Sequence, residues 1–111
     1  MQFPLLLTPL LAAFAVAQTA SFRVQLSNDA IDAAVQANIP ANGLRISIKA
    51  NFGNLGSPIV ANRALIVGAG SGRCNIFSDA AGTRKVATIV AGGNDVNFGA
   101  INLDKGVIVC Q

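Results

Sequence analysis

Five aspartates are the only acidic side chains in this chain of 111 residues, which contains no histidine and no glutamate. Without histidine, the chain cannot form a histidine-based catalytic triad or a histidine-containing metal centre. Two carboxyls with separated pKa values, held in one cleft, could still hydrolyse a glycoside. Three of the five stand in turn sequences (SDAAG, GNDV and LDKG), where aspartate commonly holds the turn. We therefore expect a non-catalytic protein, with an aspartate-based hydrolase as the alternative; the five are Asp29, Asp32, Asp79, Asp95 and Asp104.

The two cysteines, Cys74 and Cys110, are the other groups with chemistry of their own. In an oxidising compartment they most simply form one disulfide. A bridge across 36 residues would destabilise the unfolded chain by roughly 3–4 kcal/mol in the chain-entropy account. It would also hold the C-terminal strand KGVIVCQ, which would otherwise fray. Two free thiols or an intermolecular pair are the alternatives, and two cysteines without histidine do not indicate a metal site.

The first residues, MQFPLLLTPLLAAFAVAQTA, contain no charged side chain and carry the small-x-small pattern Ala15-Val16-Ala17. This pattern predicts a secretory signal peptide over residues 1–17, cleaved after Ala17, and a single secreted β-rich domain over residues 18–111. The apolar run is short and is interrupted by Pro4 and Pro9, so a retained membrane anchor is the weaker interpretation. We expect an extracellular protein with no membrane span after cleavage.

The segment ALIVGAGSGR at 64–73 resembles the start of a dinucleotide-binding motif, in which a strand enters a glycine loop. The third glycine of that motif would fall at position 73, which is Arg73, and the following CNIFSD has strand character. We therefore expect a flexible connection between strands and no cofactor.

Eight basic residues against five aspartates give a formal charge of +3. Such an excess allows weak contact with an anionic polymer or membrane surface. No basic run and few aromatic residues accompany it, so nucleic-acid binding is not expected. The partner is unknown, and a cell-wall polymer or a host protein would fit. The residues expected to make a weak anionic contact are Arg23, Arg45, Lys49, Arg84 and Lys85.

Alternating apolar residues predict a strand at 22–26. Residues 29–38 suit either a short helix or a strand that enters the Asn42-Gly43 turn, and we favour the strand. A hairpin around this turn would pair Ile39 with Ile46 and Ala37 with Ile48, with all four on one buried face. Pro40 then indicates an edge strand. On this reading Arg45, Ser47 and Lys49 point to solvent.

Further short, β-branched runs separated by glycine-rich turns complete the pattern. We expect an all-β fold, a single small antiparallel β-sandwich or partly open barrel of about seven strands with one disulfide. The register of the 73–90 hairpin stays open, because Ile76 can pair with Val86 or with Ala87.

The opening MQF, the stretch CNIFSDAAGT and the terminal VIVC resemble uncharacterised small secreted proteins of ascomycete fungi. The resemblance implies secretion and a β-rich fold, and it supplies no active site. This chain has fewer cysteines than the cysteine-rich effectors and hydrophobins. We expect a protein that acts by surface contact at the cell wall or a host interface. An aspartate-based hydrolase and a self-assembling coat component are the alternatives.

Overall fold

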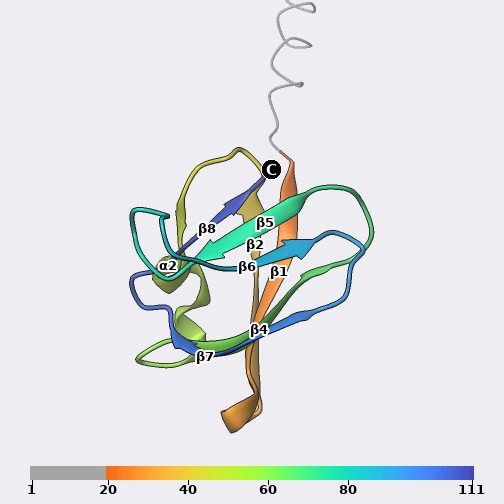
Figure 1. Cartoon of the computed structure of the whole chain (residues 1–111). Coiled ribbons are helices and arrows are strands. Elements are labelled where there is room, and N and C mark those ends of the chain that lie inside the picture. Colours follow the sequence, from red (N-terminus) through yellow and green to blue (C-terminus); the bar gives the residue numbers. More distant parts are fainter. Residues whose placement is uncertain (1–19) are drawn as a thin grey trace, which may run out of the picture.

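The computed structural model describes residues 20–111, which form two four-stranded antiparallel sheets packed face to face (Figure 1). The first sheet has the order β2 (Ala33–Pro40), β1 (Ser21–Asn28), β4 (Val60–Val67) and β7 (Val96–Asn102). The second has the order β3 (Ile46–Ser47), β8 (Val107–Cys110), β5 (Arg73–Phe77) and β6 (Lys85–Val90). Three short helices lie in the connections: η2 (Asp29–Ile31), α2 (Ile48–Phe52) and η3 (Gly53–Leu55). The predicted antiparallel sandwich is confirmed, with eight strands; the predicted leader 1–17 lies outside the described residues.

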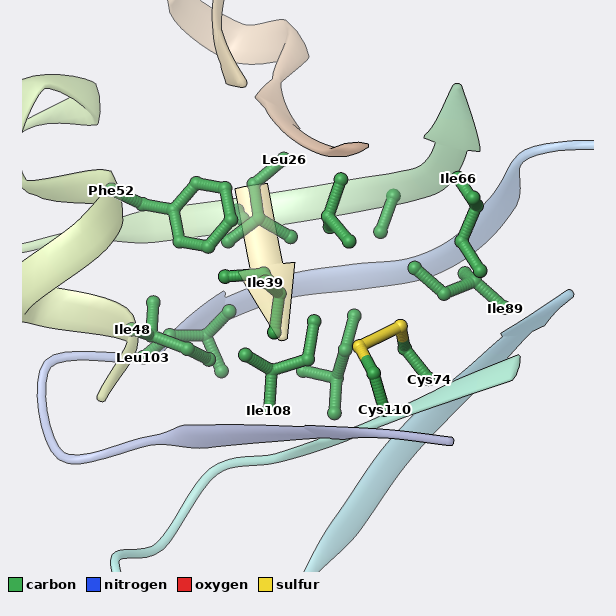
Figure 2. Packing of buried hydrophobic residues seen from close by; sticks show 14 of the residues in the cluster. Leu26, Ile39, Ile48, Phe52, Ile66, Cys74, Ile89, Leu103, Ile108 and Cys110 are labelled. Carbon is green, nitrogen blue, oxygen red and sulfur yellow. A yellow bond between two sulfur atoms is a disulfide. The ribbon is translucent and has the colours of Figure 1, made fainter. Parts of the chain in front are cut away.

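The core is formed by the inward-facing residues of both sheets (Figure 2). Leu26 of β1 and Ile108 of β8 are both fully buried. Phe52 and Leu103, also fully buried, lie in connections between strands. Burying a side chain of this size contributes about 1.5–3 kcal/mol, so these residues supply much of the stability of a small domain.

The hairpin predicted around Asn42-Gly43 is wrong. Residues 33–40 do form a strand, but β2 pairs with β1 over eight positions, and Ile39 lies opposite Phe22. The turn into β2 is η2, followed by Asp32 in the left-handed conformation (φ 53°). β2 lies at an edge of the first sheet and ends at Pro40, as the proline indicated. The apolar face of β2 is thus satisfied by an earlier strand, and the Asn-Gly segment is free to cross to the second sheet.

The prediction of a strand over 44–50 is wrong for most of the segment, because residues 48–50 belong to a helix. Only Ile46 and Ser47 form β3, which pairs with β8, and α2 begins directly afterwards. The Ser47 hydroxyl caps α2 by accepting a hydrogen bond from Ala50 N at 3.1 Å. Ile48 and Phe52, four residues apart, are both buried on one side of this turn, whereas Ile46 is only half-buried. The helix also satisfies the alternation that had indicated a strand, because Ser47 and Lys49 remain exposed.

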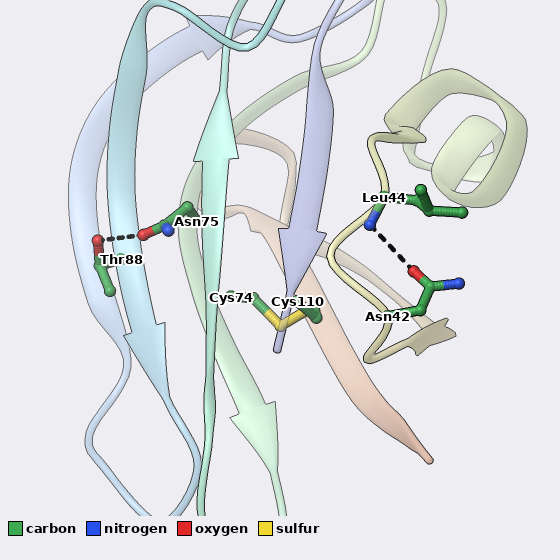
Figure 3. Close-up of a disulfide and its surroundings, with 6 residues drawn as sticks. All are labelled: Asn42, Leu44, Cys74, Asn75, Thr88 and Cys110. Carbon is green, nitrogen blue, oxygen red and sulfur yellow. Dashed lines mark hydrogen bonds between the residues drawn. A yellow bond between two sulfur atoms is a disulfide. The ribbon is translucent and has the colours of Figure 1, made fainter. Parts of the chain in front are cut away.

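The predicted disulfide is present, and it joins adjacent strands (Figure 3). Cys74 of β5 lies directly opposite Cys110 of β8, and their Cα atoms are 4.0 Å apart. The neighbouring pair, Arg73 and Gln111, exchanges two backbone hydrogen bonds of 2.9 Å, so the cysteines occupy the closer, non-hydrogen-bonded position of the ladder. The bridge therefore holds the last strand of the chain at the middle of the second sheet.

The structure also decides the register of the 73–90 hairpin and the role of the glycine-rich segment. Ile76 pairs with Ala87, which sets the register of the 73–90 hairpin. Residues 68–72 connect β4 of the first sheet to β5 of the second. Gly68, Gly70 and Gly72 all have positive φ there, which glycine adopts readily, and the segment connects two strands as expected.

Candidate functional site

Two of the five aspartates are held in an ion-pair cluster around Arg63, on an interior strand of the first sheet. Arg63 of β4 contacts Asp29 at 2.8 Å and Asp95 at 2.9 Å. Asn62 adds a hydrogen bond of 2.8 Å to Asp29. The hydrogen bond from Arg63, followed by that from Asn62, lowers the pKa of Asp29 to about 2. This cluster ties the β1–β2 turn to β4 and to the loop before β7, which is a structural role.

A third aspartate, Asp79, holds the turn between β5 and β6. Its carboxylate accepts hydrogen bonds from the backbone N–H groups of Thr83 and Arg84, each at 2.9 Å, and from the Thr83 hydroxyl. The hydroxyl of Thr83 and the N–H of Arg84 lower the pKa of Asp79, because both stabilise the carboxylate. The side chain of Arg45 also reaches this turn and donates to the Ala81 carbonyl at 2.9 Å. The turn is thus fixed from inside and from a neighbouring segment.

A pocket of about 540 Å³, open to solvent, lies where this turn meets the segments before α2 and before β8. Figure 1 shows α2, the β5–β6 turn and the start of β8 on the same side of the molecule. Gly106 lets these segments approach closely, because a Cβ at that position would lie 2.5 Å from the Phe77 carbonyl oxygen. The pocket is lined by Ser47, Ser78, Asp79, Ala80, Arg84, Asp104, Lys105, Gly106 and Val107.

Basic residues gather around this pocket. We call segments 45–49, 78–85 and 104–107 the basic pole. Four of the five residues predicted for anionic contact belong to it, together with Lys105, and all five cations are exposed. The fifth predicted residue, Arg23, lies apart on the outer face of the first sheet, where it donates to Gln36 and Asn38 at 3.1 and 3.2 Å. The five cations of the pole are Arg45, Lys49, Arg84, Lys85 and Lys105.

The charge of the chain is unevenly distributed. The basic pole has five cations and two aspartates, a formal charge of +3 that equals the charge of the whole chain. The other three arginines are balanced by the other three aspartates. Within residues 20–111, four cations of the pole make no side-chain ion pair or hydrogen bond, namely Lys49, Arg84, Lys85 and Lys105. Their charges are therefore available to a partner.

Lys105 is the site residue that the sequence analysis missed. It stands alone in LDKG and forms no basic doublet, so nothing local marks it. A weaker signal lay in the turn sequences, since LDKG and SDAAGTRK both read as turns. Turns that join antiparallel strands can lie at the same end of a sheet, which would bring Lys105 close to Arg84 and Lys85.

The described residues 20–111 contain no cluster of three or more metal-ligating side chains. Within the same residues, no helix has the length and apolar character needed to span a membrane. Comparison of the chain with protein-family models, curated proteins and solved structures gives no match.

Proposed function

We propose that this protein is a non-catalytic extracellular protein that contacts an acidic polymer, at a cell wall or host interface, through its basic pole. The single observation that carries the proposal is the segregation of charge. The whole formal excess of +3 lies at one end, on exposed side chains of which four have no partner within residues 20–111. Lysines and arginines presented together on one surface attract a polyanion more strongly than the same charges scattered over the molecule.

The interactions of three aspartates also support a non-catalytic role. Asp29 and Asp95 are held by Arg63, and Asp79 holds its own turn. A general acid needs a raised pKa, whereas the hydrogen bonds to Asp79 lower its pKa.

Binding to polygalacturonate, a linear polyanion, tests the proposal, with a neutral glucan as the comparison polymer. We expect binding of polygalacturonate that weakens steeply as ionic strength rises, because exposed charges are screened over about 8 Å at physiological salt. The neutral glucan should bind less and without this salt dependence. Lys85→Ala should weaken polygalacturonate binding, and Arg23→Ala, which removes a cation outside the pole, should not. Equal effects of the two variants, or equal binding of both polymers, would contradict the proposal.

An extracellular location is supported by the disulfide, since such bonds persist in oxidising compartments. Sequencing of the N-terminus of protein recovered from culture medium tests it. We expect the mature chain to begin at Gln18, and recovery of a chain that retains Met1 would contradict cleavage.

One observation favours an aspartate-based hydrolase as the second candidate. Asp79 and Asp104 line the same pocket, and paired-carboxylate hydrolysis needs two carboxyls in one cleft. Incubation of polygalacturonate and a neutral glucan with the protein, followed by assay of new reducing ends, separates the two functions. We expect no release above background. Release that is lost in Asp104→Asn would support the hydrolase and overturn the non-catalytic proposal.

A further inference from the structure

The pocket in the basic pole is lined by residues with unpaired hydrogen-bond donors and by one with an unpaired acceptor. Asp104 accepts a hydrogen bond from Ile59 N at 2.8 Å through Oδ1, and its Oδ2 has no partner within residues 20–111. The side chains of Arg84 and Lys105, which line the same pocket, make no hydrogen bond in that part of the chain. The residues that line this one cavity thus include a carboxylate with an unpaired oxygen and two cations without an internal partner.

The charges of the pocket lining cancel, although the surrounding pole is positive. Asp79 and Asp104 offset Arg84 and Lys105. The pocket therefore does not select a ligand by net charge. It suits a ligand whose groups both donate and accept hydrogen bonds, because only such a ligand satisfies the carboxylate and the cations together.

Part of the lining is apolar, since Ala80, Gly106 and Val107 contribute to it. A sugar ring combines these properties: its hydroxyl groups donate and accept, and its C–H faces pack against apolar surface. The cavity volume of about 540 Å³ falls within the roughly 300–1,000 Å³ typical of small-molecule sites. We infer that the pocket binds one sugar residue through its hydroxyl groups, with Asp104 as acceptor and Arg84 and Lys105 as donors.

The turn that supplies part of the site is held in place before any ligand arrives. Asp79 receives two backbone hydrogen bonds from within the turn, and Arg45 donates to the turn from outside. Gly82, at φ 72°, packs against the Arg45 side chain. Such preorganisation reduces the entropy lost on binding. The inference rests on the proposed function and deepens it: the pole attracts the acidic polymer, and the pocket recognises one of its residues.

The test is a titration of the full mature chain, followed by NMR, with methyl galactoside and with galacturonate as probes. The two share ring hydroxyls, and only galacturonate carries a carboxylate. Acetate, which has the carboxylate without the ring, is the control. We expect both sugars to shift the amide signals of residues 104–107, with a saturable response, and acetate to leave them unchanged. Shifts with galacturonate alone would identify an acidic sugar as the ligand, and shifts with both would show that the hydroxyls suffice. Equal shifts with acetate and galacturonate would overturn the inference.

A matched pair of lysine variants separates pocket recognition from general attraction. Lys105 lines the pocket, whereas Lys49 is an exposed cation of the same pole that does not. Lys105→Ala should weaken sugar binding about tenfold, the loss expected for one charge-assisted hydrogen bond, and Lys49→Ala should leave it unchanged. Both variants should weaken polygalacturonate binding.

The outcomes distinguish the two proposals. If polygalacturonate binds with the expected salt dependence and neither sugar shifts the pocket signals, the sugar site is overturned and the proposed function stands. If the sugars bind and polygalacturonate does not, the proposed function fails. If nothing binds, both fail.

Discussion

Arg63 and Arg84 are both arginines, but one is paired with aspartates inside the protein and the other is not. Arg63 lies on the first sheet between Asp29 and Asp95 and is engaged by both. Arg84 lies in the basic pole next to a turn whose aspartate, Asp79, is already occupied by backbone N–H groups. The guanidinium of Arg84 consequently has no internal partner within residues 20–111.

This difference teaches that the occupancy of the carboxylates decides which cations remain available for binding. Asp29 and Asp95 each turn a side-chain oxygen to Arg63, so a charge is neutralised internally. Asp79 turns its oxygens to its own backbone, so the nearby charges are left for a partner. The Arg63 cluster should therefore matter for stability and the basic pole for binding.

The largest effect is expected from weakening the sheet that carries the basic pole without changing its charges. The double variant Cys74→Ser, Cys110→Ser should lose about 4 kcal/mol of unfolding free energy, because the 36-residue loop is no longer closed in the unfolded chain. Denaturant unfolding of wild type and variant measures this loss. Polygalacturonate binding at low temperature should persist, since Cys74 and Cys110 lie outside the segments of the pole. Loss of binding in a variant that is still folded would contradict the separation of the two roles.

A somewhat smaller effect is expected from the apolar support beneath the basic pole. Ile48→Ala should cost about 3 kcal/mol, because Ile48 is fully buried and its removal leaves a cavity. Ile46→Ala is the matched control, and it should cost less because Ile46 is half-buried. Thermal or denaturant unfolding of both variants distinguishes them. Equal costs would mean that residues 46–50 form a strand and not the short helix α2.

Removing one cation from each region tests the comparison directly. Arg63→Ala should lower the melting temperature, by less than the two changes above, and leave polygalacturonate binding unchanged. Lys85→Ala should leave the melting temperature unchanged and weaken binding about fivefold, which corresponds to roughly 1 kcal/mol for one cation near an anionic surface. Calorimetric melting and a polymer-binding assay supply the two readouts. A variant that changes both properties to the same degree would break the comparison.

The smallest effect is a pH dependence of stability that arises in the Arg63 cluster. The pKa of Asp29 is lowered from the usual 3.8 to about 2 in the folded chain, chiefly by the hydrogen bond from Arg63. The folded state therefore binds fewer protons, so this contribution is complete above pH 3.8 and is lost as pH falls towards about 2. The Asp29→Asn variant should lose less stability over this interval than wild type, measured by melting at a series of pH values.

The parts of the fold that the sequence predicted correctly rest on local or covalent signals. Alternation identified β1, Pro40 marked an edge strand, and the two cysteines predicted one bridge. The hairpin at Asn42-Gly43 failed because the apolar face of 35–39 has two possible partners, and local pairing rules cannot rank them. β1 offers eight paired positions, and 44–50 instead uses Ile48 and Phe52 to pack as a helix.

The candidate site was only partly predictable. The basic doublet Arg84-Lys85 and the exposed positions Arg45 and Lys49 could be identified from the sequence. The sequence did not indicate that Lys105 belongs to the basic pole or that Arg23 lies outside it. Both facts depend on which turns meet at one end of the sandwich. The sequence likewise placed Asp79 and Asp104 in turns without indicating that they line one pocket.

By itself, the sequence determined the kinds of chemistry open to this protein, its net charge and its β-rich character, because these follow from composition and from patterns within a few residues. The tertiary structure alone decided which aspartates meet Arg63, which cations remain unpaired and that three segments distant in the sequence line one pocket. The physical reason is that charge pairing acts over a few ångströms of space. The distances between residues 45, 84 and 105 are set by the packing of two sheets and not by their separation along the chain.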